Sequence, residues 1–192
     1  MPNCNPACST PHKLRQAVRT IRLGGVVAYP TEAVYGLGCD PLNPAAVYRL
    51  LAIKNRPVSK GLILIAADFH QLQPFVLPLS SERMLLVEES WPGPTTWLLP
   101  ANPFVPSWLT GKHATLAIRV TAHPLAAALC RALGGPLVST SANLSTRHPA
   151  RTPLQTRLRC NGDVDMILHG ATGGDRQPTT IRDIRTGETL RP

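Results

Sequence analysis

Short apolar runs alternate along the chain with segments whose apolar residues recur every three or four positions. The runs are too short for buried helices, and several lack the polar alternation of a half-exposed strand. Strands of this kind are typical of a sheet that is covered on both faces. We therefore predict strands at residues 26–29, 62–67, 95–99, 115–120, 137–140, 164–168 and 179–184, the last of these being the final strand.

The segments between the runs carry helix signals. Apolar residues at helical spacing occupy residues 14–21, and Gly24-Gly25 ends that pattern. Asn43 followed by Pro44 is an N-cap with proline at the first helical position, and Arg56, which precedes a proline, marks the end of that helix. Further helices are predicted after Asp68, after Ser81, after His123-Pro124 and after Thr152-Pro153.

Alternating strands and helices predict one α/β domain, a twisted mixed sheet with flanking helices. The 192 residues fit a single domain, and 43% hydrophobic residues suffice for a core. We expect a flexible tail at residues 1–11 and the domain at 12–192, with residues 145–159 as a polar, Arg-rich segment that could close over a site. Without a signal peptide or a membrane-spanning run, we expect a cytoplasmic protein and no membrane contact.

The chain is strongly basic, with a net charge of +9. Arginine supplies most of this charge, and its planar fork matches phosphate and carboxylate groups. The charge therefore favours a phosphate-bearing partner, although a GC-rich coding sequence would produce the same bias.

The five cysteines do not predict a disulfide framework, because no CxxC pair is present. Cys4, Cys8 and His12 have a spacing that could bind a metal, but they lie in a segment rich in Pro and Asn without a nearby fourth ligand. We therefore predict a flexible tail there and no metal site.

Three cations lie close together after the second predicted helix. Lys54, Arg56 and Lys60 fall within seven positions with no acidic residue between them, and we expect such unpaired cations to bind a polyanion. The alternative is that they stabilise the helix C-terminus.

Polar residues also follow the strand at 137–140. The string Ser139 to Asn143 offers small hydroxyl, amide and backbone N–H groups that can hold phosphate, or else a simple cap or turn. Arg119 lies in an otherwise apolar strand, so it must pair with a protein carboxylate or bind a substrate carboxylate in a cleft. Gly36 and Gly38 lack the third glycine of a dinucleotide fingerprint, and we interpret them as a tight turn.

The chain contains no Walker A string, and its spacing indicates no Ser-His-Asp or Cys-His arrangement. The chemistry that fits these residues is positioning and charge neutralisation at a phosphoryl centre.

These motifs resemble the YrdC-like family of threonylcarbamoyl-AMP synthases, in its short, single-domain bacterial form. The resemblance covers residues 12–192 and rests, in order, on YPTEAVYGLGCD, KNRP, KGLILIA, WPGP, LAIRVTAHP, PLVSTSAN and TTIRD. It implies a twisted α/β sheet around a large basic cavity. The implied reaction converts L-threonine, bicarbonate and ATP, with Mg2+, to L-threonylcarbamoyladenylate and pyrophosphate, for the N6-threonylcarbamoyl modification of adenosine-37 in tRNA.

The resemblance also implies roles for individual residues. Lys54 and Arg56 would be catalytic and would bind the ATP phosphates with Ser141 and Asn143, while Thr115 and Arg191 are weaker candidates for the nucleotide. The residues expected around threonine are Thr31, Lys60, Arg119, Ser139 and Thr179, with Arg119 on the threonine carboxylate. Downstream proteins would transfer the threonylcarbamoyl group to tRNA.

The alternative function is an RNA-binding module without catalysis, whose basic surface holds tRNA or double-stranded RNA. Such a surface needs many exposed cations and often stacking aromatics. Aromatics make up only 5% of this chain and the key cations adjoin buried strands, so the sequence favours the enzyme, with RNA contact left open as a second property.

Overall fold

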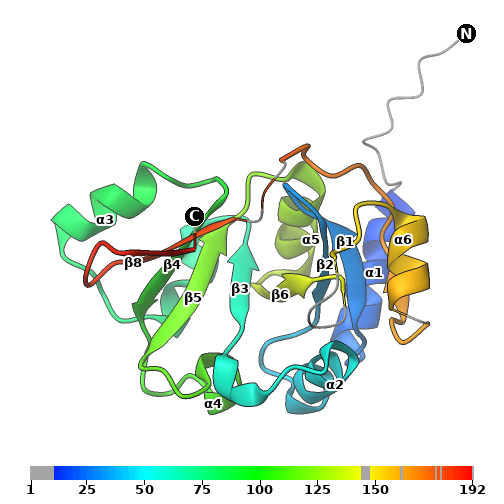
Figure 1. Ribbon diagram of the computed structural model, residues 1–192, viewed down its shortest axis with the longest axis horizontal. Helices are drawn as coiled ribbons and strands as arrows, with labels where there is room; N and C mark the ends of the chain where they lie inside the picture. The colour runs from blue at the N-terminus through cyan, green and yellow to red at the C-terminus, as the bar shows by residue number, and fades with distance from the viewer. Residues whose placement is uncertain (1–10, 144–147, 161, 176, 178, 192) are drawn as a thin grey trace, which may run out of the picture.

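The computed structural model describes residues 11–143, 148–160, 162–175, 177 and 179–191. Within them, nine strands form one sheet in the order β7-β1-β2-β6-β3-β5-β4-β8-β9, and helices cover it (Figure 1). The strands are β1 Val27–Pro30, β2 Tyr35–Gly38, β3 Ile63–Ala66, β4 Thr95–Pro100, β5 Thr115–Val120, β6 Leu137–Ser141, β7 Met166–Ile167, β8 Thr180–Asp183 and β9 Thr189–Arg191. The helices are α1 Pro11–Arg22, α2 Pro44–Lys54, α3 Ser81–Glu88, α4 Ser107–Thr110, α5 Pro124–Leu133 and α6 Pro153–Arg159, with 3-10 turns η1 Val58–Lys60, η2 Phe69–Gln71 and η3 Gln73–Phe75.

The sheet is mixed, as predicted. β3 pairs parallel with β5, β4 with β8 and β1 with β7, while the other neighbouring pairs are antiparallel. Most apolar runs of the sequence lie in central strands whose residues are mostly buried, whereas the run at 164–168 forms the half-buried edge strand β7. The predicted fold class, a mixed α/β sheet with flanking helices, is therefore confirmed.

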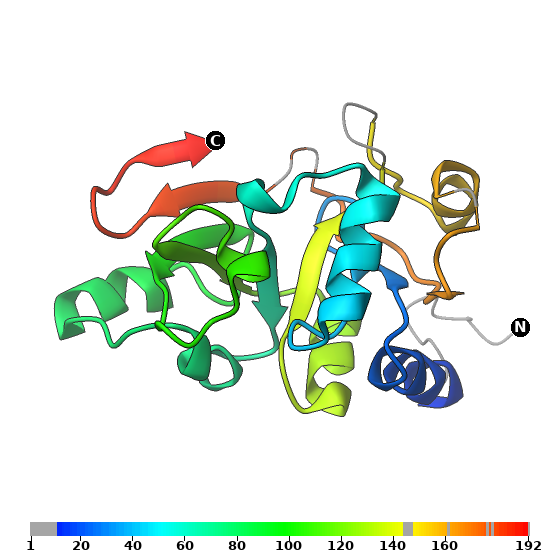
Figure 2. The same ribbon diagram turned by 90° about the horizontal axis from the view of Figure 1, so that it is seen from below.

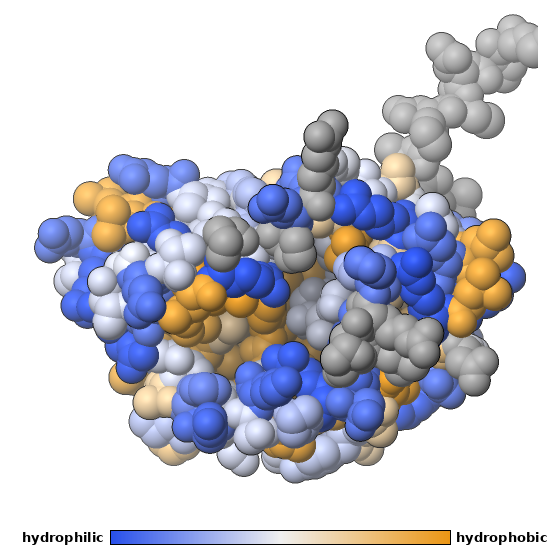
Figure 3. Space-filling view, viewed as in Figure 1, coloured by the Kyte–Doolittle hydropathy of each residue, from blue (hydrophilic) through white to orange (hydrophobic). Residues whose placement is uncertain are grey.

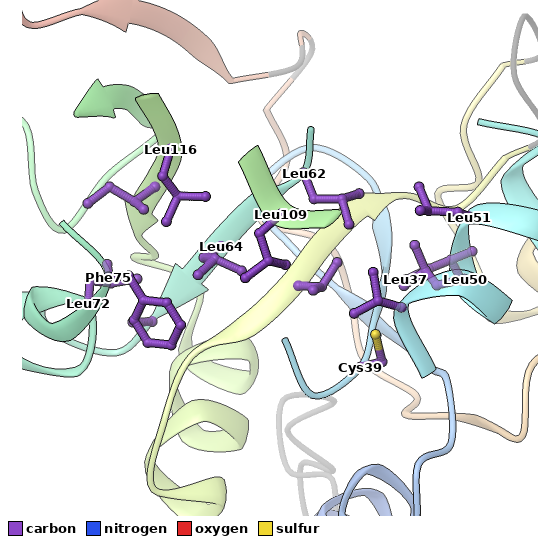
Figure 4. Close-up of a cluster of buried hydrophobic side chains, with 14 of the residues drawn as sticks. Leu37, Cys39, Leu50, Leu51, Leu62, Leu64, Leu72, Phe75, Leu109 and Leu116 are labelled. Carbon is purple, nitrogen blue, oxygen red and sulfur yellow. The ribbon is translucent and has the colours of Figure 1, made fainter. Parts of the chain in front are cut away.

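Two hydrophobic clusters cover the two faces of the sheet. On one face, α1 and α5 pack together and bury Ile21 and Leu129 against Tyr29 and Ile65 (Figure 2). The other face carries the larger cluster, in which leucines of α2 and the loops meet leucines of the strands; Figure 4 labels Leu37, Leu50, Leu51, Leu62, Leu64, Leu72, Leu109 and Leu116 within it. Burying this much apolar surface is the main force that fixes the sheet.

The predicted cap of α2 is present. Asn43 Oδ1 accepts a hydrogen bond from Ala46 N at 3.2 Å, and Asn55, in the left-handed conformation with φ 47°, ends the helix before Arg56. The cap of α3 was misplaced by one residue, since Ser80 rather than Ser81 accepts from Arg83 N.

Two further predictions were wrong. Residues 35–38 are not a tight turn but strand β2, because their backbone pairs with β1 on one side and β6 on the other. The strand at β8 is not the last, because Thr189–Arg191 folds back on it as β9. That strand is short and largely exposed, so the sequence contains no apolar run that would predict it.

The predicted flexible tail at residues 1–11 lies outside the described residues except for Pro11, the first residue of α1. The segment predicted as a polar loop at 145–159 is described from His148, and α6 occupies its last part. None of the helices in the described part of the chain is long and apolar enough to cross a bilayer.

Candidate active site

A cavity of about 660 Å3 opens beside the sheet. In Figure 3 it is the hollow near the middle of the molecule, with an apolar wall and hydrophilic residues at its rim. Its wall includes ten of the eleven residues predicted from the sequence to bind substrates: Thr31, Arg56, Lys60, Thr115, Arg119, Ser139, Ser141, Asn143, Thr179 and Arg191. The cavity thus gathers motifs that lie more than 150 residues apart in the chain.

The register of the sheet explains why these side chains meet. Gly36 pairs with Ser141, and Ile63 pairs with Ser139 on the next strand. Residues directly opposite in a ladder share a face, as do residues two apart in one strand. Because Ile65 in turn pairs with Arg119, one sheet face presents Gly36, Ser139, Ser141 and Arg119 together.

The eleventh predicted residue, Lys54, does not line the cavity. It is the last residue of α2, its exposed fraction is 4%, and its Nζ donates to Ser141 O at 2.5 Å and to Asn143 Oδ1 at 2.8 Å. Within the described structure, Lys54 therefore acts on the cavity through Ser141 and Asn143, which do line it.

Arg56 lies at the cavity wall, where its Nη2 donates to Gly61 O at 2.9 Å and its Nε to the same oxygen at 3.2 Å. The expectation that Lys54 and Arg56 are unpaired was thus wrong, because backbone carbonyls and polar side chains satisfy them. The helix-terminus alternative fits Lys54, a basic residue in the last turn of α2, whereas Arg56 follows the helix and binds carbonyls outside it.

The sequence left two environments open for Arg119, a protein carboxylate as its partner or a position in a cleft, and the structure shows both. Its Nη1 lies 3.4 Å from Glu32 Oε2, so it is paired with a protein carboxylate. It also lines the cavity, with an exposed fraction of 5%, and its buried Nε has no hydrogen-bond partner.

Glu32 is held by other contacts as well. Its Oε1 accepts from Thr121 Oγ1 at 2.6 Å and from Ala122 N at 3.0 Å. Burial alone would raise the pKa of Glu32, but Arg119 and these hydrogen bonds outweigh it and lower the pKa below its usual value. Glu32 is therefore ionised and holds the guanidinium of Arg119 in place.

Unsatisfied polar atoms concentrate at this part of the cavity. Among the described residues, four buried side-chain atoms lack a hydrogen bond, and three of them are Tyr29 Oη, Glu32 Oε2 and Arg119 Nε. Native structures leave few such atoms, and a group of them near a cavity points to a ligand or to water.

The C-terminal strands also contribute to the wall of the cavity. Arg191 on β9 donates from Nη2 to Thr179 O at 2.6 Å, and burial followed by the nearby Arg119 lowers the pKa of Arg191. Asp183 of β8 is the sole carboxylate among the lining residues that the structure describes, and Arg185 pairs with it at 2.7 Å.

The wall residues that sequence reasoning missed include Gly36, His113, Asp183 and Arg185. Alternation along β8 could have indicated Asp183, because it lies two residues from Ile181 and shares its face. His113 follows an exposed turn and carried no signal.

The described residues offer no group of three or more His, Cys, Asp or Glu that could hold a metal ion. Cys4 and Cys8 lie outside the described residues, and His12 is exposed in the first turn of α1.

A family model described as telomere recombination, Sua5_yciO_yrdC, matches residues 19–192. The chain belongs to the Sua5/YciO/YrdC family. Proteins named threonylcarbamoyl-AMP synthase are similar to it: one from Nitrosococcus oceani is 58% identical over 93% of this chain and 97% of the relative, and one from Halorhodospira halophila is 53% identical over 100% of both.

Solved structures of the family share the fold. P. abyssi Sua5 complexed with L-threonine is 34% identical with a TM-score of 0.87 and matches 93% of this chain and 53% of its own. E. coli YciO is 31% identical with a TM-score of 0.86 and matches 97% of this chain and 91% of its own. The resemblance inferred from the motifs is thereby confirmed.

Proposed function

We propose that this chain is a threonylcarbamoyl-AMP synthase that converts L-threonine, bicarbonate and ATP to L-threonylcarbamoyladenylate and pyrophosphate. The observation that carries the proposal is one cavity in which Arg56, Ser141 and Asn143 lie together with the buried Arg119. Cations and small polar groups suit the phosphates of ATP, and a guanidinium with an unsatisfied Nε suits a carboxylate. The close relatives named for this activity support the same assignment.

The reaction requires no nucleophilic side chain. The amine of threonine takes up CO2 derived from bicarbonate and loses a proton, which gives a carbamate. A carbamate oxygen then attacks the α-phosphorus of ATP, and the bond to the bridging oxygen breaks as pyrophosphate leaves. The protein supplies proximity of the two substrates and, from Arg56, a positive charge beside the developing negative charge.

Mg2+ fits this site only as a companion of ATP. The single lining carboxylate that is described, Asp183, is already paired with Arg185, so the protein offers no carboxylate set of the kind that holds Mg2+. We infer that the ion is carried by the phosphates, and that the protein's contribution is the surrounding cations.

We propose that the product passes to proteins that transfer the threonylcarbamoyl group to tRNA, and that the chain acts in the cytoplasm. The alternative of an RNA-binding module without catalysis is not favoured, because relatives named threonylcarbamoyl-AMP synthase match nearly the whole chain. Contact with tRNA or double-stranded RNA stays a prediction.

The test is pyrophosphate release from ATP with threonine and bicarbonate omitted in turn. We expect release only when both are present, because the carbamate is the nucleophile. Equal release without threonine would contradict the proposal.

A further inference from the structure

Strand β2 contains two glycines, Gly36 and Gly38, which lie on the same face of the sheet. Packing explains the second. A Cβ at Gly38 would lie 2.6 Å from Val138 O and 2.8 Å from Tyr29 Cε1, which leaves no room for any side chain. Gly38 is therefore required by the fold.

Packing does not explain Gly36 in the same way. A Cβ there would lie 3.3 Å from Thr31 Cγ2, 3.4 Å from Tyr29 Cζ and 3.5 Å from Ser139 Oγ, so only the contact with Thr31 is tight and calls for a shift of a few tenths of an ångström. Its φ is also outside the left-handed region that favours glycine. A glycine inside a strand weakens the strand, and such a glycine often marks a place where a ligand approaches the backbone.

The space beside Gly36 belongs to the cavity. The three nearest atoms are the methyl carbon of Thr31, the hydroxyl oxygen of Ser139 and the ring carbon Cζ of Tyr29, whose own hydroxyl group has no hydrogen-bond partner. A threonine side chain presents one methyl and one hydroxyl. Arg119, the candidate for its carboxylate, lies on the same sheet face.

We propose that Gly36 is a specificity-determining residue that leaves room for the side chain of the amino-acid substrate between Thr31, Ser139 and Tyr29. The inference rests on the proposed function, because it takes threonine as that substrate. A methyl group added at position 36 would occupy the space of the threonine methyl, which serine lacks.

The test compares Gly36→Ala with two control variants. Gly38→Ala adds the same methyl to the same strand but against backbone, and Gly135→Ala adds it where no atom lies within 4 Å. For each variant, the measurements are the melting temperature, calorimetric binding of L-threonine, and kcat/KM for threonine, serine and ATP.

For Gly36→Ala we expect kcat/KM for threonine to fall by about 10- to 100-fold, the range associated with one methyl group in a pocket. The value for serine should fall much less, the KM for ATP should stay within about twofold, and the melting temperature should stay within about 3 °C of the wild type. Gly38→Ala should instead lower the melting temperature clearly, and Gly135→Ala should change neither property.

An unchanged preference for threonine over serine in Gly36→Ala would overturn the inference, as would an equal loss for threonine and ATP. If the wild type binds L-threonine but releases no pyrophosphate, the proposed function fails, and the calorimetric comparison of the glycine variants still decides the role of Gly36. If the wild type binds no threonine, the inference fails as well.

Discussion

At the scale of single residues, the guanidinium of Arg119 illustrates how a buried charge can serve structure and substrate together. Its partner Glu32 lies 3.4 Å from Nη1 and is itself held by Thr121 and Ala122. The pair keeps the charge stable in an apolar strand, while Nε stays without a hydrogen bond beside the cavity. Removing one member of such a pair commonly costs about 3–5 kcal/mol, because it leaves the other charge buried alone.

We therefore expect Arg119→Lys to raise the KM for threonine by at least about tenfold, because lysine keeps the charge but loses the fork that binds a carboxylate at two points. The KM for ATP should stay within a few-fold, and the melting temperature should fall modestly. Steady-state kinetics with each substrate varied, beside a melting curve, measure both effects. The matched control is Glu32→Gln, which retains an acceptor for Thr121 and Ala122 but replaces Oε2 with a donor that repels Arg119. An unchanged KM for threonine in Arg119→Lys would show that Arg119 does not bind the substrate.

At the scale of elements, the end of α2 is tied to the end of β6 through Lys54. Its ammonium group donates to Ser141 and Asn143, so the helix end determines where two cavity residues lie. Burial first, and the nearby Arg56 second, lower the pKa of Lys54 from 10.5 to about 8. Lys54 thus gives up its proton within an accessible pH range, although the unfolded chain would retain it.

This shift has opposite consequences for stability and for activity. Between pH 8 and 10.5 the unfolded chain binds more protons at Lys54 than the folded chain, so the contribution of Lys54 to the free energy of unfolding increases as the pH rises through this window. Activity should fall in the same range, because a neutral amine donates more weakly to Ser141 and Asn143.

We expect kcat/KM for ATP to decline above an apparent pKa of about 8. The Lys54→Met variant should show no such decline in kcat/KM, and its turnover should be at least about a hundredfold lower. Its free energy of unfolding should not increase from pH 8 to 10.5. Kinetics and denaturant unfolding across the pH range measure these quantities. If kcat/KM for ATP still declines above pH 8 in Lys54→Met, another group causes the decline.

At the scale of the whole molecule, cations outnumber carboxylates in the wall of the cavity. Among the described lining residues, five cations face one carboxylate: Arg56, Lys60, Arg119, Arg185 and Arg191 against Asp183. A cavity with an excess of positive charge attracts a polyanion over distances comparable with the Debye length, which is about 10 Å at 0.1 M salt.

We therefore expect the KM for ATP to rise several-fold when NaCl is raised from about 50 to 500 mM, because salt screens this attraction. Threonine carries no net charge, so its KM should change by less than about twofold. Initial rates at matched pH and free Mg2+ measure the two constants. Equal changes of the two KM values with salt would show that the charge of the cavity does not favour binding of the nucleotide.

The sequence by itself determined seven of the nine segments that form the sheet, and it determined which residues could carry chemistry. Apolar runs such as residues 62–67 and caps such as Asn43 are local signals, because burial and helix initiation depend on neighbouring side chains. The motif resemblance added the roles of the substrate-binding residues, ten of which line one cavity.

Only the tertiary structure decided what each of these residues contacts. Whether Arg119 meets Glu32, whether Lys54 faces the cavity or holds Asn143, and whether the glycines at 36 and 38 form a turn or a strand all depend on partners distant in the chain. The short strand β9, which places Arg191 beside Thr179, likewise has no apolar signal of its own. Contacts of this kind arise from strand register and helix packing, which no local pattern of residues encodes.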